Sequence, residues 1–351
     1  MPVPRVLERV DLGRWATGWD DLVLRQPVPS PFQRTWWLDA VGDHDVPTTW
    51  LLVTDGEQLL GGLAVGVRRR GPTQRFGAPG PTVLCPDHLD VLVEPGREHA
   101  VAAALADWFG GSGQRLLDLR GAVADSLLAR ALGARHEPHD EAPYDVVEAG
   151  GDWLATRSSS FRRNVRRGRN RLEAAGFTHR RLGPDDVRTG LAELRRLHED
   201  RPGREALLAE LPRLTAAVAA GAARDEARVD LLAGPGGAVA ATVSFVVAGR
   251  ICLYQVARST AREHGSAGTV LLADVVQDAV AGGCHEVDLL RGAEDYKGSF
   301  ADRSRPLERV RVAHGAWASA QLAGEDAARW LRARARDGVS ATRRSPDGRD
   351  A

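Results

Sequence analysis

The order of strand and helix patterns in the second half of the chain is the feature that most limits its fold. Three apolar or β-branched stretches separated by glycine turns predict an antiparallel meander. Apolar residues then recur at helical spacing until Gly282-Gly283 ends the helix. Strands are expected at 228–232, 238–247, 251–256, 286–290 and 309–313. A short helix is expected before the last strand, so the unit is a mixed α/β one.

The first half repeats this order more faintly. Strands are expected at 49–53, 59–67, 89–93 and 116–119, with a helix at 98–109. The last of these strands runs into Arg120-Gly121-Ala122, and its counterpart runs into Arg291-Gly292-Ala293. The same tripeptide at the same place in two similar element orders predicts a duplicated domain. We expect lobes at 1–140 and 141–325, and a frayed helix with a disordered tail at 326–351.

Length and charge agree with this organisation. A chain of 351 residues exceeds one typical core. Its net charge is zero, so bulk electrostatics predict neither a DNA nor a membrane partner. No run reaches the roughly 20 apolar residues that span a bilayer, and the N-terminus lacks an apolar signal core, so we expect a cytoplasmic protein.

Cysteine and histidine spacing argues against a metal site. Cys85, Cys252 and Cys284 are odd in number and far apart, which favours buried reduced thiols. His136 and His139 lie beside acidic residues, which we interpret as a solvated loop. No structural metal is expected.

Lys297 is the only lysine among 47 lysine and arginine residues. Lysine is a compact charge that can stabilise a small developing anion, whereas arginine is a planar fork that keeps its proton. The alternative is a lysine that has not yet drifted to arginine. Lys297 closely follows the strand at 286–290, and strand ends often carry the chemistry of open sheets. The first copy has no such lysine, so we expect chemistry in the second lobe.

The loop between meander and helix predicts an anion site. Its small residues let the backbone approach a ligand, and free amides in the first turn of a helix favour a pyrophosphate. An ordinary turn with a helix cap is the alternative. The pattern Arg-x-x-Gly-x-Ala resembles the acyl-CoA pyrophosphate loop of GNAT acyltransferases. The donor-binding candidates are Arg262, Gly265, Ser266, Ala267, Gly268, Thr269 and Tyr254.

The stretch 142–315 resembles a bacterial branch of two-lobed GNAT proteins related to the Fem peptidyl aminoacyltransferases. That branch includes proteins with polysaccharide- or cellulose-associated functions. The resemblance rests on the motifs at 160–167, 268–272 and 288–297. It implies tandem GNAT-like lobes, each a twisted mixed sheet flanked by helices, that use acyl-CoA as a co-substrate and hold no permanent cofactor. Ala267, where the branch often has proline, favours acyl-CoA over aminoacyl-tRNA.

An arginine-rich segment follows in the same region. Phe161, Val165, Gly168 and Leu172 are spaced to form one face of a helix. Arginines occupy six of the eight positions between these residues, with no acid among them, and like charges four residues apart oppose helix formation. The segment is either a solvated basic helix or a contact for a phosphorylated acceptor, the CoA 3′-phosphate or an RNA backbone. The anion-binding candidates are Arg163, Arg166, Arg167 and Arg291.

The resemblance implies that Lys297 faces the reacting carbonyl and stabilises the oxyanion. Asp288 and Glu294 are candidates to accept the proton of the amine. Alternatively, Asp288 is a structural partner of Arg291, and Glu294 begins a short helix. Tyr296 and Tyr254 could donate to the thiolate leaving group, although core packing is the expected role of Tyr254.

The chain has no Gly-x-Ser-x-Gly elbow, P-loop or metal triad, so hydrolase, kinase and metalloenzyme functions lose support. We expect an N-acyltransferase that moves an acyl group, with acetyl favoured, from acyl-CoA to an amine of a small molecule, sugar or peptide. One alternative is an aminoacyl-tRNA-dependent, amide-forming transferase with tRNA as partner. Another is a non-catalytic binding or scaffold protein. The acceptor and the oligomeric state stay open.

Overall fold

The computed structural model describes residues 4–42, 46–199, 201–292 and 294–342. The strands are β1 (Arg5–Arg9), β2 (Thr48–Asp55), β3 (Gln58–Arg70), β4 (Thr73–Gly77), β5 (Leu92–Val93), β6 (Gln114–Val123), β7 (Arg135–Val146), β8 (Thr178–Arg181), β9 (Ala227–Gly234), β10 (Gly237–Val247), β11 (Arg250–Arg258), β12 (Glu286–Asp288) and β13 (Arg303–His314). The α-helices are α1 (Ala16–Leu24), α2 (Thr35–Val41), α3 (Glu98–Phe109), α4 (Leu127–Leu132), α5 (Trp153–Thr156), α6 (Ser159–Ala174), α7 (Val187–Glu199), α8 (Glu205–Ala209), α9 (Leu211–Ala222), α10 (Ala267–Ala281) and α11 (Ala316–Thr342). The 3-10 helices are η1 (Gly13–Trp15), η2 (Pro31–Gln33), η3 (Thr82–Leu84), η4 (Pro184–Asp186), η5 (Arg262–His264) and η6 (Asp295–Ser299).

These strands form one mixed sheet with two similar halves. We call the part from β1 to α4 the first lobe and the part from α5 to η6 the second lobe. The strand order is β1-β2-β3-β4-β6-β13-β7-β12-β11-β10-β9-β8, and β5 pairs with β3. In both lobes an antiparallel meander ends beside one parallel strand, since β4 pairs with β6 as β11 pairs with β12. The repeated pairing supports the duplication that the two Arg-Gly-Ala tripeptides predict.

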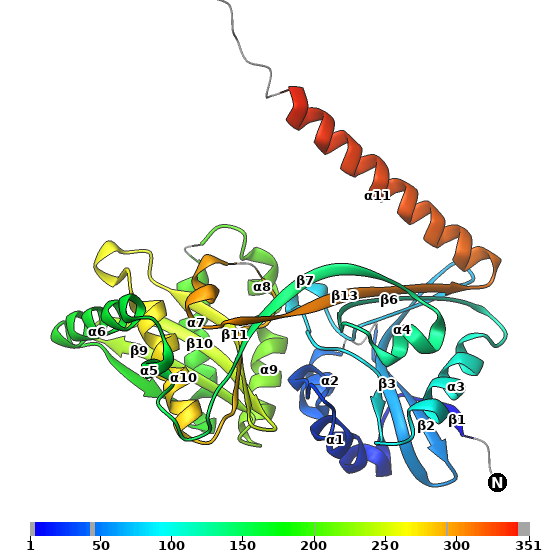
Figure 1. Ribbon diagram of the computed structural model, residues 1–351, viewed down its shortest axis with the longest axis horizontal. Coiled ribbons are helices and arrows are strands. Elements are labelled where there is room, and N and C mark those ends of the chain that lie inside the picture. Colours follow the sequence, from blue (N-terminus) through cyan, green and yellow to red (C-terminus); the bar gives the residue numbers. More distant parts are fainter. Residues whose placement is uncertain (1–3, 43–45, 200, 293, 343–351) are drawn as a thin grey trace, which may run out of the picture.

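The lobes exchange their last strands (Figure 1). β7 follows the first lobe in the chain but pairs with β12 of the second. β13 follows the second lobe but pairs with β6 of the first, and β7 and β13 pair with each other. The expectation that the strand at 309–313 completes its own unit is therefore wrong. Residue 140 lies inside β7 and residue 325 inside α11, so both expected boundaries fall within elements.

Ion pairs hold the exchanged strands, which are not apolar. Arg309 binds Asp118 of β6 through Nε at 2.6 Å and Nη2 at 2.7 Å. Arg305 binds Glu286 of β12 at 2.8 Å and 2.6 Å. His136, which we expected in a loop, lies in β7 instead, as does His139. Backbone pairing on both sides of β7 explains why a polar sequence forms a strand there.

Aromatic packing and a buried ion pair join the lobes. The ring of Phe32 lies 5.9 Å from that of Phe245, and the ring of Trp37 lies 5.6 Å from that of Tyr254. Arg34 donates to Glu226 through Nε at 2.8 Å and Nη2 at 2.6 Å. The two lobes consequently share one apolar core.

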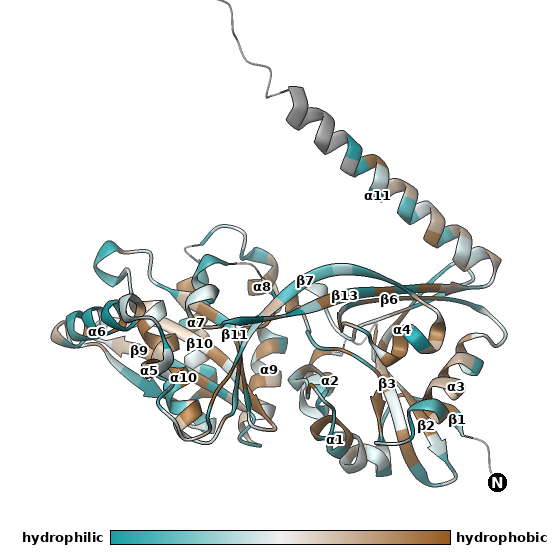
Figure 2. Ribbon diagram, viewed as in Figure 1, coloured by the Kyte–Doolittle hydropathy of each residue, from teal (hydrophilic) through white to brown (hydrophobic). Residues whose placement is uncertain are grey.

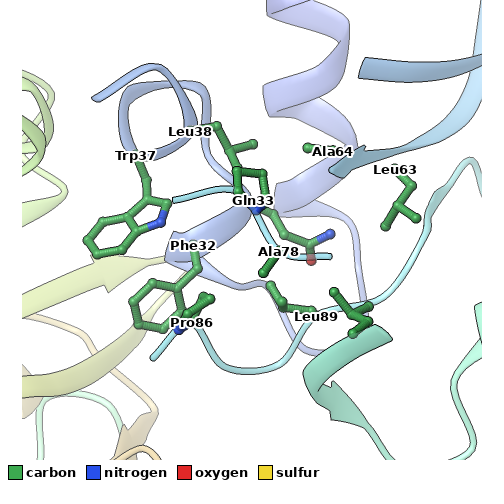
Figure 3. Close-up of a pocket in the computed structure, with 11 residues that line it drawn as sticks. Phe32, Gln33, Trp37, Leu38, Leu63, Ala64, Ala78, Pro86 and Leu89 are labelled. Atoms are coloured by element: carbon green, nitrogen blue, oxygen red, sulfur yellow. The ribbon is translucent and has the colours of Figure 1, made fainter. Parts of the chain in front are cut away.

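A small gap in the first-lobe part of this core is lined by Phe32, Leu63 and Leu89 (Figure 3). Its volume is about 10 Å³, close to the least that holds one water molecule. The gap is a packing defect and has no room for a ligand.

The helix predictions are confirmed where apolar residues recur with a clear helical period. α3 spans the expected residues, and the buried residues of α6 are Phe161, Val165, Gly168 and Leu172. Of the strand expected at 89–93, only Leu92 and Val93 form a strand, β5. The strand that pairs with β6 in this lobe is the polar strand β4. Cys252 and Cys284 are buried and Cys85 is half-buried, and all three are free thiols.

α11 begins at Ala316 and projects from the body of the protein (Figure 1). It starts ten residues before the helix expected from 326, and residues 343–351 of the expected disordered tail lie outside the described residues. Within the described ranges, no helix is long and apolar enough to cross a membrane.

Candidate functional site

β11 and β12 diverge and leave an opening between them. They pair in parallel only from Arg250 with Glu286 to Cys252 with Asp288. After β12 the chain follows β7, because the Leu289 amide donates to the Pro143 carbonyl at 2.9 Å. β11 instead continues beside β10 to its end. The edge of β11 beyond Cys252 therefore has no partner strand among the described elements.

A β-bulge lies at the start of this opening. Val243 of β10 pairs with Gln255, but Ser244 pairs with Leu253, so Tyr254 is the extra residue. Bulges redirect side chains and are common beside active sites. The Tyr254 hydroxyl donates to the Leu84 carbonyl in the first lobe at 2.7 Å, and burial raises the pKa of Tyr254. Tyr254 thus links the lobes at the base of the opening.

The opening widens into a cleft of about 630 Å³ between the lobes. Its walls are β11, the turn after β12, the first turn of α10, the segment between α7 and α8, and the first-lobe loop around η3. Apolar side chains of β11, α10 and the turn after β12 line part of it: Leu253, Val256, Leu272 and Leu289. The volume is typical of sites for small molecules and cofactors.

The first turn of α10 presents backbone amides at this cleft. Ser266 is its N-cap residue, but no side chain caps the helix. Gly265, Gly268 and Thr269 line the cleft. A Cβ atom on Gly268 would lie 3.1 Å from Cδ of Arg258, so glycine gives close access here. Uncapped amides at a helix start can bind an anion.

The turn after β12 has an unusual backbone. Leu290 has φ of +54° and Gly292 has φ of +118°, so two of three successive residues lie in the left-handed region. A side chain on Gly292 would also collide with Glu294 and come within 3.0 Å of Nζ of Lys297. Strained turns of this kind often occur at functional sites.

Lys297 holds this turn in place. Its ammonium donates to the Leu290 carbonyl at 3.1 Å and the Arg291 carbonyl at 2.6 Å. It also forms an ion pair with Glu294 at 2.9 Å. An ammonium has three donors, so all of them are engaged. The Lys297 side chain is 5% exposed, which leaves little space for a guanidinium.

Residues 159–298 match the family model described as an acetyltransferase (GNAT) domain. The second lobe is a GNAT acyltransferase domain. The strand divergence, the bulge and the uncapped helix start all belong to this domain and border the cleft between the lobes, which we call the GNAT cleft. No curated protein matches the chain in sequence.

Solved structures share the fold over most of the chain. The structure of FemX has a TM-score of 0.61 and 10% identity, over 84% of this chain and 95% of that one. The C-terminal domain of a putative lysylphosphatidylglycerol synthetase from Agrobacterium fabrum has a TM-score of 0.56 and 14% identity, over 91% of this chain and 96% of that one. L-PGS from Bacillus licheniformis has a TM-score of 0.52 and 14% identity, over 78% of this chain and 85% of that one. The enzyme is an acyltransferase with a two-lobed GNAT and Fem-like fold.

Asp288 lies beneath the GNAT cleft and does not line it. One carboxylate oxygen lies 2.7 Å from Arg250 and 2.8 Å from His88, and the other accepts the Leu290 amide at 2.7 Å. Burial opposes the charge of Asp288, but His88 and Arg250 outweigh it and hold the pKa well below its usual range. The alternative that Asp288 pairs with Arg291 is wrong, because Arg250 takes that place.

Glu294 and Tyr296 both line the GNAT cleft. The Glu294 side chain is 57% exposed, so water and substrate can reach its carboxylate. Burial, with the nearby Glu294 charge, raises the pKa of Tyr296 to about 12. Tyr296 therefore keeps its proton at neutral pH.

Arg291 joins the GNAT domain to the first lobe. It donates to the Pro86 carbonyl at 2.6 Å, and its backbone amide donates to Asp87 at 2.8 Å. Its guanidinium also binds the Asp87 carboxylate and approaches His139 at 3.0 Å. Arg291 lines the cleft, but these contacts occupy most of its donors.

The remaining predicted residues lie beside the cleft. α6 is the hydrophilic helix at the edge of the GNAT domain (Figure 2). A Cβ atom on its Gly168 would lie 2.6 Å from Oγ of Ser266, which accepts from Arg171 at 2.8 Å. Arg163, Arg166 and Arg167 are exposed and line no part of the cleft. Arg262 is exposed and Ala267 is buried.

Sequence reasoning missed three cleft arginines: Arg201, Arg204 and Arg258. Arg258 ends β11 directly before the predicted loop, which is a signal that could have identified it. Arg201 and Arg204 lie between α7 and α8, where no motif marks them.

Proposed function

We propose that this enzyme transfers an acyl group, with acetyl as the first choice, from acyl-CoA to the amine of a small molecule, sugar or peptide. The divergence of β11 and β12 beside the uncapped start of α10 is the observation that carries the proposal. The CoA diphosphate would accept bonds from amides of the first turn, around Gly268 and Thr269. The pantetheine arm would lie along the unpaired edge of β11.

The acyl carbonyl would then lie near the turn that follows β12. The amine nitrogen attacks the thioester carbonyl carbon, a C–N bond forms and the C–S bond breaks. Glu294 accepts the proton that the amine loses, directly or through water. Tyr296 donates to the departing CoA thiolate and is reprotonated by solvent.

Lys297 has a positioning role in this arrangement. Its donors are engaged by two carbonyls and Glu294, so the oxyanion would bind backbone amides on the free edge of β11 instead. Lys297 keeps the turn and Glu294 in place. Asp288 supports the turn from below.

Calorimetric titration of acetyl-CoA into the full chain tests the donor. The double variant Gly265→Glu and Gly268→Glu places negative charge against the proposed diphosphate site. Gly183→Glu is the control, because no atom lies within 4 Å of a Cβ at Gly183. We expect micromolar binding that the double variant loses and the control keeps. A folded parent that binds no acetyl-CoA contradicts the proposal and leaves the aminoacyl-tRNA and scaffold alternatives.

An aminoacyl-tRNA donor is the second candidate, because of α6. Arg163, Arg166 and Arg167 have no ion pair within the described residues, although their helix packs against the start of α10. Such a face suits an RNA backbone. Charged tRNA that binds with a steep salt dependence, and loses affinity in the triple variant to glutamate, would favour this donor. We expect the enzyme to work in the cytoplasm with either donor, and expect no DNA or membrane partner.

A further inference from the structure

Three arginines line the cleft at positions that the proposed chemistry does not use. Arg201 and Arg204 extend from the segment between α7 and α8, and Arg258 lies at the end of β11. None of them has an ion pair within the described residues. The acids that line the same cleft, Asp87 and Glu294, are bound by Arg291 and Lys297. Among the residues that the structure describes, the cleft therefore has uncompensated positive charge.

The three charges lie close enough to affect one another. Burial lowers the pKa of Arg201, and Arg204 and Arg258 lower it further. Burial also lowers the pKa of His198 to about 4, with contributions from Arg204 and Arg201. Clustered like charges destabilise a protein, so an anionic ligand between them would relieve the repulsion.

The cluster extends away from the diphosphate site towards the proposed reaction centre. Arg258 packs over Gly268 at the start of α10. Arg204 is close enough to Tyr296 to act on its pKa, after the larger effects of burial and Glu294. α8, which follows Arg204, contacts η3 in the first lobe. Arg201 and Arg204 thus belong to the side of the cleft that the donor helix leaves open.

We propose that Arg201 and Arg204 bind an anionic group, a carboxylate or a phosphate, on the amine acceptor. This proposal rests on the proposed function and narrows its acceptor to amines that also carry a negative charge. Arginine suits the task because its fork binds carboxylate or phosphate with two hydrogen bonds. Phosphates of the donor have the same chemistry, so the test must separate the two sources.

The test is calorimetric titration of inorganic phosphate into the full chain, first alone and then saturated with CoA. The variant is Arg201→Ala with Arg204→Ala, and the control is Arg195→Ala, which removes an exposed arginine of α7 paired with Glu199. We expect phosphate to bind with CoA present, and the double variant to lose at least tenfold in affinity. The phosphate affinity of the control should change by less than twofold. The acetyl-CoA affinity of the double variant should also change by less than twofold.

Three results would overturn the proposal. Phosphate that binds only without CoA, or a double variant with at least tenfold weaker acetyl-CoA binding, would assign the arginines to the donor. Absence of phosphate binding to the folded parent would remove the anion site altogether. If acetyl-CoA itself fails to bind, the proposed function fails, while the titration without CoA still tests whether the arginines bind an anion.

Discussion

Replacing Lys297 with methionine should destabilise the protein by removing the donors of a strained turn. Methionine has a similar length but no charge, so the Leu290 and Arg291 carbonyls lose their side-chain donor. An unsatisfied buried polar group costs about 1–3 kcal/mol. Part of this loss of stability is offset, because the variant no longer has to bury a charged ammonium away from water. We expect the free energy of unfolding to fall by about 2–3 kcal/mol.

Urea unfolding followed by tryptophan fluorescence measures this change, and the slope should stay constant. Glu294→Gln is the control, because it removes only the exposed partner of Lys297 and should cost about 0.5 kcal/mol or less. Lys297→Arg should destabilise nearly as much as methionine, since the guanidinium has little space beside Gly292. Unchanged stability in Lys297→Met, with activity reduced at least 100-fold, would refute the positioning role and favour a direct catalytic one.

Three other predictions follow from buried and cleft groups. Glu226→Ala should lower stability by about 3 kcal/mol in urea unfolding, because it leaves Arg34 buried without its main partner; a loss no larger than that of the exposed Glu57→Ala would contradict this. The pKa of Asp288 is depressed in the folded state, so its contribution is complete above the ordinary value of 3.8 and is lost as pH falls further. The free energy of unfolding should therefore fall less steeply from pH 5 to pH 2 in Asp288→Asn than in the parent. The same dependence on pH in both proteins would argue against the ion-pair role. Tyr296→Phe should lower kcat about 100-fold with an unchanged dissociation constant for acetyl-CoA; an unaffected kcat would exclude Tyr296 as the proton donor.

Elements with a clear hydrophobic period could be predicted from the sequence. The buried face of α6 consists of the four residues that the spacing selects, because only one face of that helix lacks charge. The second-lobe meander and the helix after it also follow from apolar runs and glycine turns. The loop before α10 could be located because glycine and small residues mark close backbone approaches.

Strands held by polar contacts could not be predicted in the same way. β7 carries many charged side chains, and β4 is a short strand with Phe76 as its one large apolar residue. The stability of both strands comes from backbone pairing with neighbours remote in sequence. The exchange of β7 and β13 is invisible in a local pattern, since pairing partners depend on the whole sheet.

The site was predicted only in part for a similar reason. The sequence marks Lys297 and Glu294 as candidates, but the three contacts of Lys297 depend on the backbone of the turn. Arg201 and Arg204 are ordinary arginines in the sequence, and only the fold brings them to the cleft beside Arg258.

A crystal structure of the full chain with CoA tests the central claim most directly. We predict that the CoA sulfur lies between Leu253 and Leu289, and that the diphosphate accepts bonds from amides of Gly268 and Thr269. CoA bound elsewhere, with the β11 edge still free, would contradict the proposed donor site.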